Sequence, residues 1–96
     1  MKTIYISGQI SNNPNFAKDF ERAEKKLTKQ GYNVINTVKV GSSLGFLTYE
    51  QFMQLDFRLI DIADSVYMLK GWEKSQGATA EYHYAKSLGK EIINIK

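Results

Sequence analysis

Short apolar runs alternate with longer amphipathic segments along this chain of 96 residues. The short runs are rich in β-branched and aromatic residues and predict four strands, at residues 3–7, 32–36, 65–69 and 91–95. Apolar residues at helical spacing predict three helices, over residues 15–30, in a segment that begins at Thr48, and over residues 78–88. Glycine and polar residues between these segments predict loops at 37–47 and 70–77.

Helix-terminus signals support these boundaries. Asn13 is a capping residue type and Pro14 suits the first helical position, while Gly31 supplies a C-terminal stop. Thr48 followed by Gln51 matches a capping box, in which the two side chains satisfy each other's backbone amides. The first two helices therefore have sequence signals at their predicted starts.

The alternation of strands and helices with short connections predicts right-handed crossovers and a parallel sheet covered by helices on both faces. We expect one domain over residues 1–96 with an α/β fold. The architecture that fits is a small flavodoxin-like or Rossmann-like three-layer sandwich. Its four-stranded parallel sheet would have the strand order 2-1-3-4.

The composition excludes several kinds of catalytic and metal-binding group but says little about the fold. A hydrophobic fraction of 43% with a single proline argues against disorder. With no cysteine, the chain has no thiolate nucleophile and no cysteine zinc site, and His83 alone cannot build a metal cluster. We therefore expect no metal and no cofactor, and any catalysis must use carboxylates, hydroxyls or amines.

Charge gives little support for nucleic-acid binding. The 13 basic and 10 acidic residues leave a net charge of +3 that is spread along the chain. Basic residues in segment 15–30 are interleaved with acidic ones, which is typical of a solvated helix face.

Residues 1–7 lack the apolar core of a signal peptide, and no run approaches the roughly 20 apolar residues of a membrane span. We expect a cytoplasmic protein that does not bind membranes.

In open parallel sheets, ligands bind beyond the carboxyl ends of the strands, where the strand order reverses. Three segments are predicted to meet there, at residues 7–11, 36–47 and 71–77. Their glycines, hydroxyls and amides suit a phosphate or a sugar. Neither G-x-G-x-x-G nor G-x-x-x-x-G-K-[ST] is present, which disfavours a dinucleotide site and a P-loop.

Two carboxylates lie on apolar helix arcs. At about 100° per residue, Asp56 falls in the middle of an arc of large apolar residues, and Glu81 shares the arc of Ala78 and Ala85. A buried acid needs a hydrogen bond, a cation or a shifted pKa. Each acid alone has a structural explanation, in which Asp56 caps a neighbouring loop and Glu81 pairs with the helix N-terminus. Together, near one edge of one sheet, they favour a two-carboxylate site.

Aromatic residues near this edge allow two interpretations. Tyr5 in a central strand suits the core, but its hydroxyl could also orient an acid at the site. Trp72 either closes the core or stacks on a base, and we favour stacking because its loop belongs to the predicted site. His83 lies on the opposite side of its helix from Glu81 and is expected at the surface. Met53 is interpreted as a packing residue.

Motifs spread over nearly the whole chain resemble a known superfamily. They are Ile4-Tyr5-Ile6-Ser7-Gly8-Gln9-Ile10, the segment from Asp56 to Ala63-Asp64-Ser65-Val66-Tyr67, Ser75-x-Gly77-Ala78-x-x-Glu81, and Ala85-x-x-Leu88-Gly89-Lys90-x-Ile92. In this order and spacing they resemble the nucleoside 2-deoxyribosyltransferase-like superfamily, and within it a short bacterial and phage branch. That superfamily includes the 2′-deoxynucleoside 5′-phosphate N-hydrolases and the cytidine monophosphate hydrolases.

The resemblance implies a reaction at the anomeric carbon of a nucleoside or nucleotide. By position it implies Glu81 as the nucleophile, Asp56 as the acid that assists departure of the base, and Tyr5 as the residue that orients the nucleophile. Ser75 matches a serine that contacts the sugar or its 5′-phosphate. The expected substrate contacts are Ser7, Gly8, Gln9, Ile10, Trp72, Ser75, Gly77 and Ala78.

The function expected from the sequence is therefore N-glycosidic bond cleavage, or base transfer, on a small nucleoside or nucleoside 5′-monophosphate. Formation of an oxocarbenium-like sugar, trapped by one carboxylate while another group handles the proton, fits two acids. The alternative is a protein that binds a nucleotide-derived metabolite or signal without turnover. A homodimer or higher homo-oligomer is expected in either case, because so small a sheet protein has apolar surface to cover.

Overall fold

Four parallel strands form one sheet in the order β2-β1-β3-β4, in a computed structural model that describes residues 1–94. The strands are β1 Thr3–Ser7, β2 Asn33–Asn36, β3 Ser65–Met68 and β4 Glu91–Asn94. The helices are α1 Phe16–Lys29, α2 Thr37–Gly41, α3 Tyr49–Ile62 and α4 Gln76–Ser87, with a 3₁₀ turn η1 at Trp72–Lys74. The predicted α/β class and strand order are confirmed. Ile95, the end of the predicted fourth strand, lies outside the described residues.

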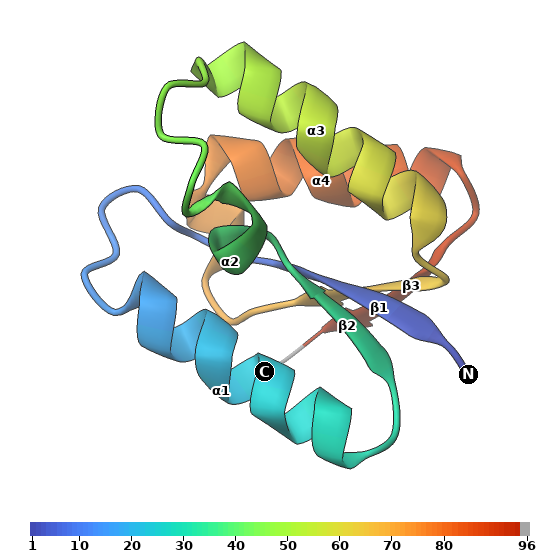
Figure 1. Ribbon diagram of the computed structural model, residues 1–96. Coiled ribbons are helices and arrows are strands. Elements are labelled where there is room, and N and C mark those ends of the chain that lie inside the picture. The colour runs from blue at the N-terminus through green and yellow to red at the C-terminus, as the bar shows by residue number, and fades with distance from the viewer. Residues whose placement is uncertain (95–96) are drawn as a thin grey trace.

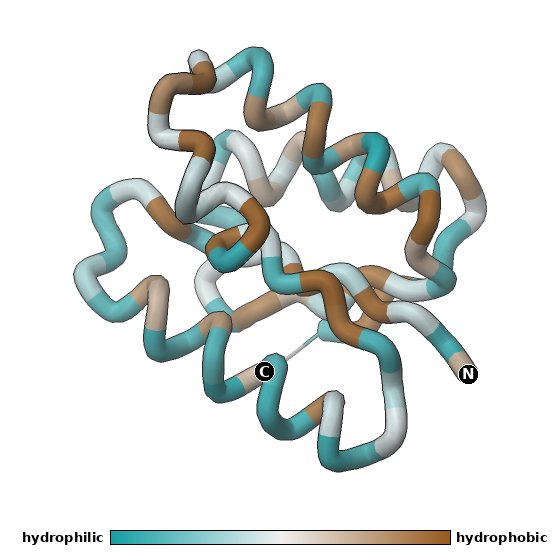
Figure 2. The backbone as a smooth tube through the Cα atoms, viewed as in Figure 1, coloured by the Kyte–Doolittle hydropathy of each residue, from teal (hydrophilic) through white to brown (hydrophobic). Residues whose placement is uncertain are grey.

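Helices cover both faces of the sheet, with α1 on one side and α3 and α4 on the other (Figure 1). Successive side chains of a strand point to opposite faces. Ile4 and Ile6 of β1 accordingly pack into the core beneath α1, whereas Tyr5 packs into the core beneath α3 and α4. Along α3 the backbone alternates between hydrophobic and hydrophilic residues (Figure 2), because only one side of this helix faces the protein. The result is the predicted three-layer sandwich.

The helix-terminus predictions are confirmed in two cases and wrong in one. Thr48 and Gln51 form the capping box of α3, and Gly31 follows α1 at a φ of +95°, a conformation that glycine adopts without strain. Helix α1, however, begins at Phe16 rather than at Pro14. The Asn13 side chain instead accepts from the Asn15 backbone amide at 3.1 Å, so it stabilises the turn before the helix.

The segment predicted as a loop after β2 contains a short helix. Helix α2 begins directly at the strand end, and the side chain of Asn36 caps it by accepting from the Val38 amide at 3.0 Å. The predicted loop after β3 likewise includes the 3₁₀ turn η1. Helix α4 begins at Gln76, two residues before the predicted start, because Ser75 is its N-cap. The two elements that were not predicted, α2 and η1, follow the carboxyl ends of β2 and β3.

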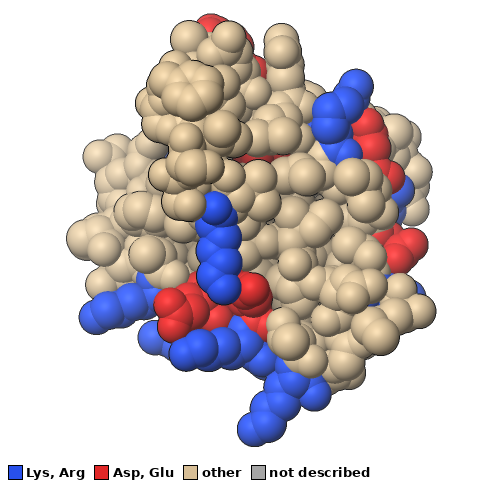
Figure 3. Space-filling model, viewed as in Figure 1, with Lys and Arg blue, Asp and Glu red and all other residues tan. Residues whose placement is uncertain are grey.

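Basic and acidic side chains gather over α1, in the lower part of Figure 3. On this helix Lys25 pairs with Glu21 at 3.0 Å, and Arg22 lies 3.9 Å from Asp19. Such exposed pairs contribute little to stability, as expected for a solvated face. Within residues 1–94, no helix is long and apolar enough to cross a membrane.

Candidate functional site

A cavity of about 830 Å³ opens where the carboxyl ends of β1 and β2 meet the start of α4. Its apolar lining comes from both sides of the sheet: Phe16 and Phe20 belong to α1, and Phe52 and Met53 belong to α3. Glycines, hydroxyls and amides of the strand-end segments also line it, together with Glu81. Aromatic and polar groups in one cavity suit a ligand that has one flat apolar part and one hydroxyl-bearing part.

Glu81 is the acid of the cavity and is only 5% exposed. Its carboxylate accepts two hydrogen bonds from β1: the Tyr5 hydroxyl donates to Oε2 at 3.0 Å, and the Ser7 hydroxyl donates to Oε1 at 2.7 Å. Both donors are completely buried. The carboxylate is therefore fixed in one orientation by groups that cannot exchange their partners for water.

Local sequence explains why Glu81 faces the sheet. The Ser75 side chain accepts from the Ala78 amide at 3.1 Å and so defines the first turn of α4. Ala78 and Ala85 are buried against the core, and Glu81 lies three residues after the first and four before the second. Residues at these spacings share one helix face. Two small alanines thus bring α4 close to β1, with the acid between them.

Asp56 is the second buried acid, with 7% of its surface exposed. It lies one turn before the buried Ile60 on α3, so the same helix face carries both into the protein. Its Oδ1 accepts from the Thr37 hydroxyl at 2.6 Å. The prediction that both acids face the interior is confirmed, and Thr37 provides Asp56 with a hydrogen bond.

The two acids act on each other electrostatically. Burial holds the pKa of the Glu81 carboxyl well above its usual value, and the nearby charge of Asp56 raises that pKa further. The Ser7 and Tyr5 hydroxyls oppose this rise because they stabilise the anion. Burial, followed by the charges of Glu81 and Asp56, also raises the pKa of Tyr5 well above its usual value, so its hydroxyl keeps its proton.

Five of the eight predicted substrate contacts line the cavity. They are Gly8, Ile10, Ser75, Gly77 and Ala78. Tyr5 and Ser7 lie behind Glu81 and reach the site through it. The Gln9 amide donates to the Ser11 carbonyl at 3.1 Å, and Gln9 and Asp56 are not among the described residues that line the cavity.

Trp72 does not occupy the predicted position. Its ring stacks on Tyr82 with the centroids 4.6 Å apart, and it packs against the core beneath α3 and α4. Among the cavity-lining residues that the structure describes, Trp72 is absent. The alternative interpretation, in which this tryptophan closes a small core, therefore describes its position better. His83 is exposed, as expected.

Several cavity residues were not predicted. Thr37, which bonds Asp56, belongs to a segment that was expected at the site, and its place directly after β2 was the available signal. Met53, interpreted as packing only, lines the cavity and lies beside Gly77. Phe16 and Phe20 also line the cavity. They recur along α1 at the same helical spacing as core residues, so the sequence does not distinguish them from residues that only pack in the core.

Within residues 1–94, no group of three or more histidine, cysteine, aspartate or glutamate side chains is arranged to hold a metal ion. The chemistry that these residues offer is that of two carboxyls and their hydroxyl partners. A search of curated proteins finds no match to the chain. Residues 2–94 match the family described as "Domain of unknown function (DUF4406)", and the chain therefore belongs to that family.

Proposed function

We propose that this protein cleaves the N-glycosidic bond of a small nucleoside or nucleoside 5′-monophosphate, or transfers its base, with Glu81 as the nucleophile. The observation that carries the proposal is the Glu81 carboxylate, held by the Tyr5 and Ser7 hydroxyls at an aromatic-walled cavity. The motif resemblance to the nucleoside 2-deoxyribosyltransferase-like superfamily supports the same role. The aromatic side chains of the lining suit the base, and the polar strand-end segments suit the sugar.

In the proposed reaction, a Glu81 oxygen attacks the anomeric carbon and forms a glycosyl ester. The bond between that carbon and the base nitrogen breaks, and its electron pair leaves with the base, which takes up a proton. Water then attacks the same carbon and breaks its bond to the Glu81 oxygen, the proton that water loses returns to the two acids, and the free sugar leaves. If a second base attacks instead of water, the product is a new nucleoside.

Asp56 is the proposed source of the proton for the departing base. Burial and the nearby charge of Asp56 raise the pKa of the Glu81 carboxyl, so Glu81 holds a proton more readily than a free acid does. When this proton passes through Asp56 to the base, Glu81 becomes the anion that attack requires. The Thr37 hydroxyl, bonded to Asp56 at 2.6 Å, orients that carboxyl during the transfer.

Base release tests the proposal. The protein is incubated with deoxyribonucleosides, ribonucleosides and their 5′-monophosphates, and free base is measured by chromatography. Glu81→Gln, which keeps the size of the side chain, should remove the activity. Glu21→Gln on the exposed face of α1 makes the same change in charge and should retain it. Absence of base release with every substrate would contradict the enzymatic function.

A binding protein without turnover is the second candidate. It is favoured by one observation: Asp56 is bonded to Thr37 and is not among the described residues that line the cavity. This candidate predicts that a nucleotide-derived ligand is recovered intact from the protein. Calorimetric binding of an uncleaved nucleoside, equal in wild type and Glu81→Gln, would support it over the enzyme.

We also propose that the protein acts as a homodimer or higher homo-oligomer. Phe46 is 79% exposed and Tyr49 is 53% exposed, and Tyr49 also lines the cavity. Burying such residues in a second copy would stabilise association at about 25 cal/mol per Å² of apolar surface. Sedimentation velocity measures the mass in solution, and a monomer over the whole concentration range would contradict either assembly.

A further inference from the structure

Helix α2 carries Thr37, the donor to Asp56, yet it has only five residues. An isolated helix of this length is unstable in water, because nucleation fixes several residues before hydrogen bonds repay the cost. Its position must therefore come from contacts with the rest of the protein. Val38 supplies one of them by packing against the core beneath α1.

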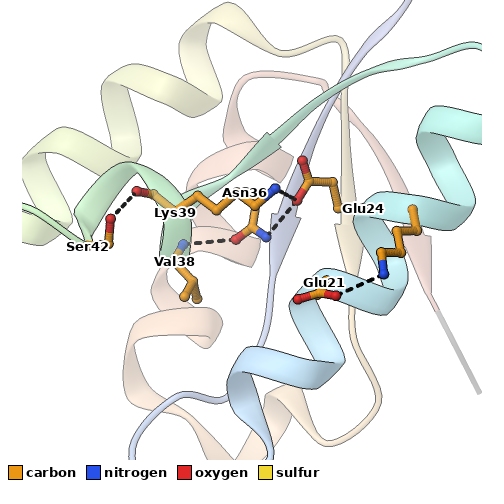
Figure 4. A network of polar contacts seen from close by, with 7 residues as sticks. Glu21, Glu24, Asn36, Val38, Lys39 and Ser42 are labelled. Atoms are coloured by element: carbon orange, nitrogen blue, oxygen red, sulfur yellow. Dashed lines mark hydrogen bonds and ion pairs between the residues drawn. The ribbon is translucent and has the colours of Figure 1, made fainter.

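A polar contact to α1 supplies another. The Glu24 carboxylate, 23% exposed, receives the Lys39 ammonium at 2.9 Å and the Asn36 side-chain amide at 3.1 Å. Figure 4 shows both groups pointing from the α2 region toward Glu24. Glu24 of α1 thus binds both Asn36, which caps α2, and Lys39, the third residue of α2.

The same asparagine links this contact to the site. Asn36 uses its amide nitrogen for Glu24 and its oxygen for the Val38 amide, so its orientation is fixed at both ends. Thr37 is the next residue in the chain and donates to Asp56. A shift of the Asn36 backbone therefore moves Thr37 relative to Asp56.

We propose that Glu24 is a positioning residue for the candidate site: through Asn36 and Lys39 it fixes α2, and so keeps the Thr37 hydroxyl on Asp56. Its link to catalysis rests on the function proposed above, but its effect on the two acids does not. Glu24 itself lies outside the described lining of the cavity and touches neither Asp56 nor Glu81 in any described contact.

The chain provides a matched control. Glu21 lies one turn earlier on α1, and its carboxylate pairs with Lys25 of the same helix at 3.0 Å. Figure 4 shows Glu21 beside α1, whereas Glu24 is joined to Asn36 and Lys39. Glu21→Gln changes the net charge as much as Glu24→Gln does. It removes no contact with α2 among the described hydrogen bonds and ion pairs.

The test measures the protonation of Glu81 by the carbon chemical shift of its side-chain carboxyl across a pH titration. The titratable groups that act on Glu81 are Tyr5 from β1 and Asp56 from α3. If Thr37 no longer donates to Asp56, that carboxyl is no longer held in one orientation beside Glu81, and its effect in raising the pKa of Glu81 weakens. The pKa of Glu81 should then fall.

We expect the pKa of Glu81 to fall in Glu24→Ala, which loses both contacts. It should fall less in Glu24→Gln, whose amide oxygen still accepts from Asn36, and stay at the wild-type value in Glu21→Gln. A Glu24→Ala titration identical to wild type would overturn the proposal, as would an equal change in Glu21→Gln. If Glu24→Ala fails to fold, Glu24→Gln decides in the same way.

Kinetics provide a second readout where base release is found. Glu24→Ala should lower kcat about three- to tenfold and leave KM within a factor of about two, because the substrate contacts remain. An unchanged kcat would overturn the positioning role. If no substrate is cleaved, the proposed function fails, while the titration still decides whether Glu24 positions Thr37.

Discussion

The Tyr5 hydroxyl donates a 3.0 Å hydrogen bond to Oε2 of Glu81, across the interface between β1 and α4. This bond lowers the pKa of Glu81 against the larger opposing effects of burial and Asp56. Tyr5→Phe keeps the ring in the core and removes only the donor. We expect the acidic limb of the kcat/KM profile to move to higher pH, because Glu81 then ionises less readily. A limb at the wild-type pH would contradict this role for Tyr5.

Glu81 should cost the protein stability at neutral pH. Its folded-state pKa lies above the usual value of 4.5, so the folded state binds its proton more tightly than the unfolded state does. Its contribution to stability is therefore present below about pH 4.5 and is lost as the pH rises through the folded-state pKa.

Replacing this acid tests the sign of the effect. Glu81→Gln should raise the free energy of unfolding at pH 8 by about 1 to 2 kcal/mol, and by much less at pH 4. Urea unfolding at the two pH values measures both differences. Glu21→Gln should show no such gain, because Glu21 is exposed. A Glu81→Gln variant that is less stable than wild type at pH 8 would show that the acid contributes net stability there.

Thr37 links α2 to the second acid and is itself 9% exposed. Thr37→Val keeps the shape of the side chain but leaves a buried Asp56 oxygen without its donor. We expect a loss of about 1 to 3 kcal/mol in the free energy of unfolding. Thr28→Val on the exposed side of α1 is the control and should change it by less than about 0.5 kcal/mol. If the two substitutions changed the free energy of unfolding equally, the hydrogen bond from Thr37 to Asp56 would not contribute to stability as we expect.

Gly8 permits the close approach of the first cavity loop to the end of β3. A Cβ at this position would lie 2.8 Å from Leu69 Cδ1 and 3.0 Å from Leu69 Cβ. Leu69 is also held by its backbone amide, which donates to the Ser7 carbonyl at 2.8 Å. Gly8→Ala should therefore destabilise the protein by about 1 to 3 kcal/mol, measured by thermal or urea unfolding.

Gly45 offers the matched substitution, since a Cβ there meets no atom within 4 Å. Gly45→Ala should leave stability unchanged or raise it slightly by restricting the unfolded chain. If Gly8→Ala and Gly45→Ala had the same effect on stability, the close contact between position 8 and Leu69 would not limit the side chain at position 8.

The strands and the two buried acids could be predicted because their signals are local. Continuous apolar runs identify strands covered on both faces, and the helical period shows that Asp56 and Glu81 face inward. Helix α2 could not be predicted in this way. Its sequence ends at Gly41 and is followed by Ser42 and Ser43, which is typical of a loop, and contacts from Asn36 and from Glu24 on another helix support it.

The position of Trp72 shows the same limit. Its loop does lie beside the cavity, since Lys74 and Ser75 line it, and the prediction for the segment was sound. The direction of the indole depends on Tyr82, which offers a stacking partner on α4. Partner choice between two aromatic residues ten positions apart depends on tertiary packing, which composition and periodicity do not describe.

Detection of a sugar ester on Glu81 would identify this acid as the nucleophile. Wild type and Glu81→Gln are mixed with substrates from the nucleoside and nucleotide panel, quenched rapidly in acid, digested and examined by peptide mass spectrometry. We expect the Glu81 peptide of wild type to gain the mass of the sugar residue, together with release of free base, and the variant to show neither. Base release that persists in Glu81→Gln, or no adduct and no free base with any substrate, would contradict this role of Glu81.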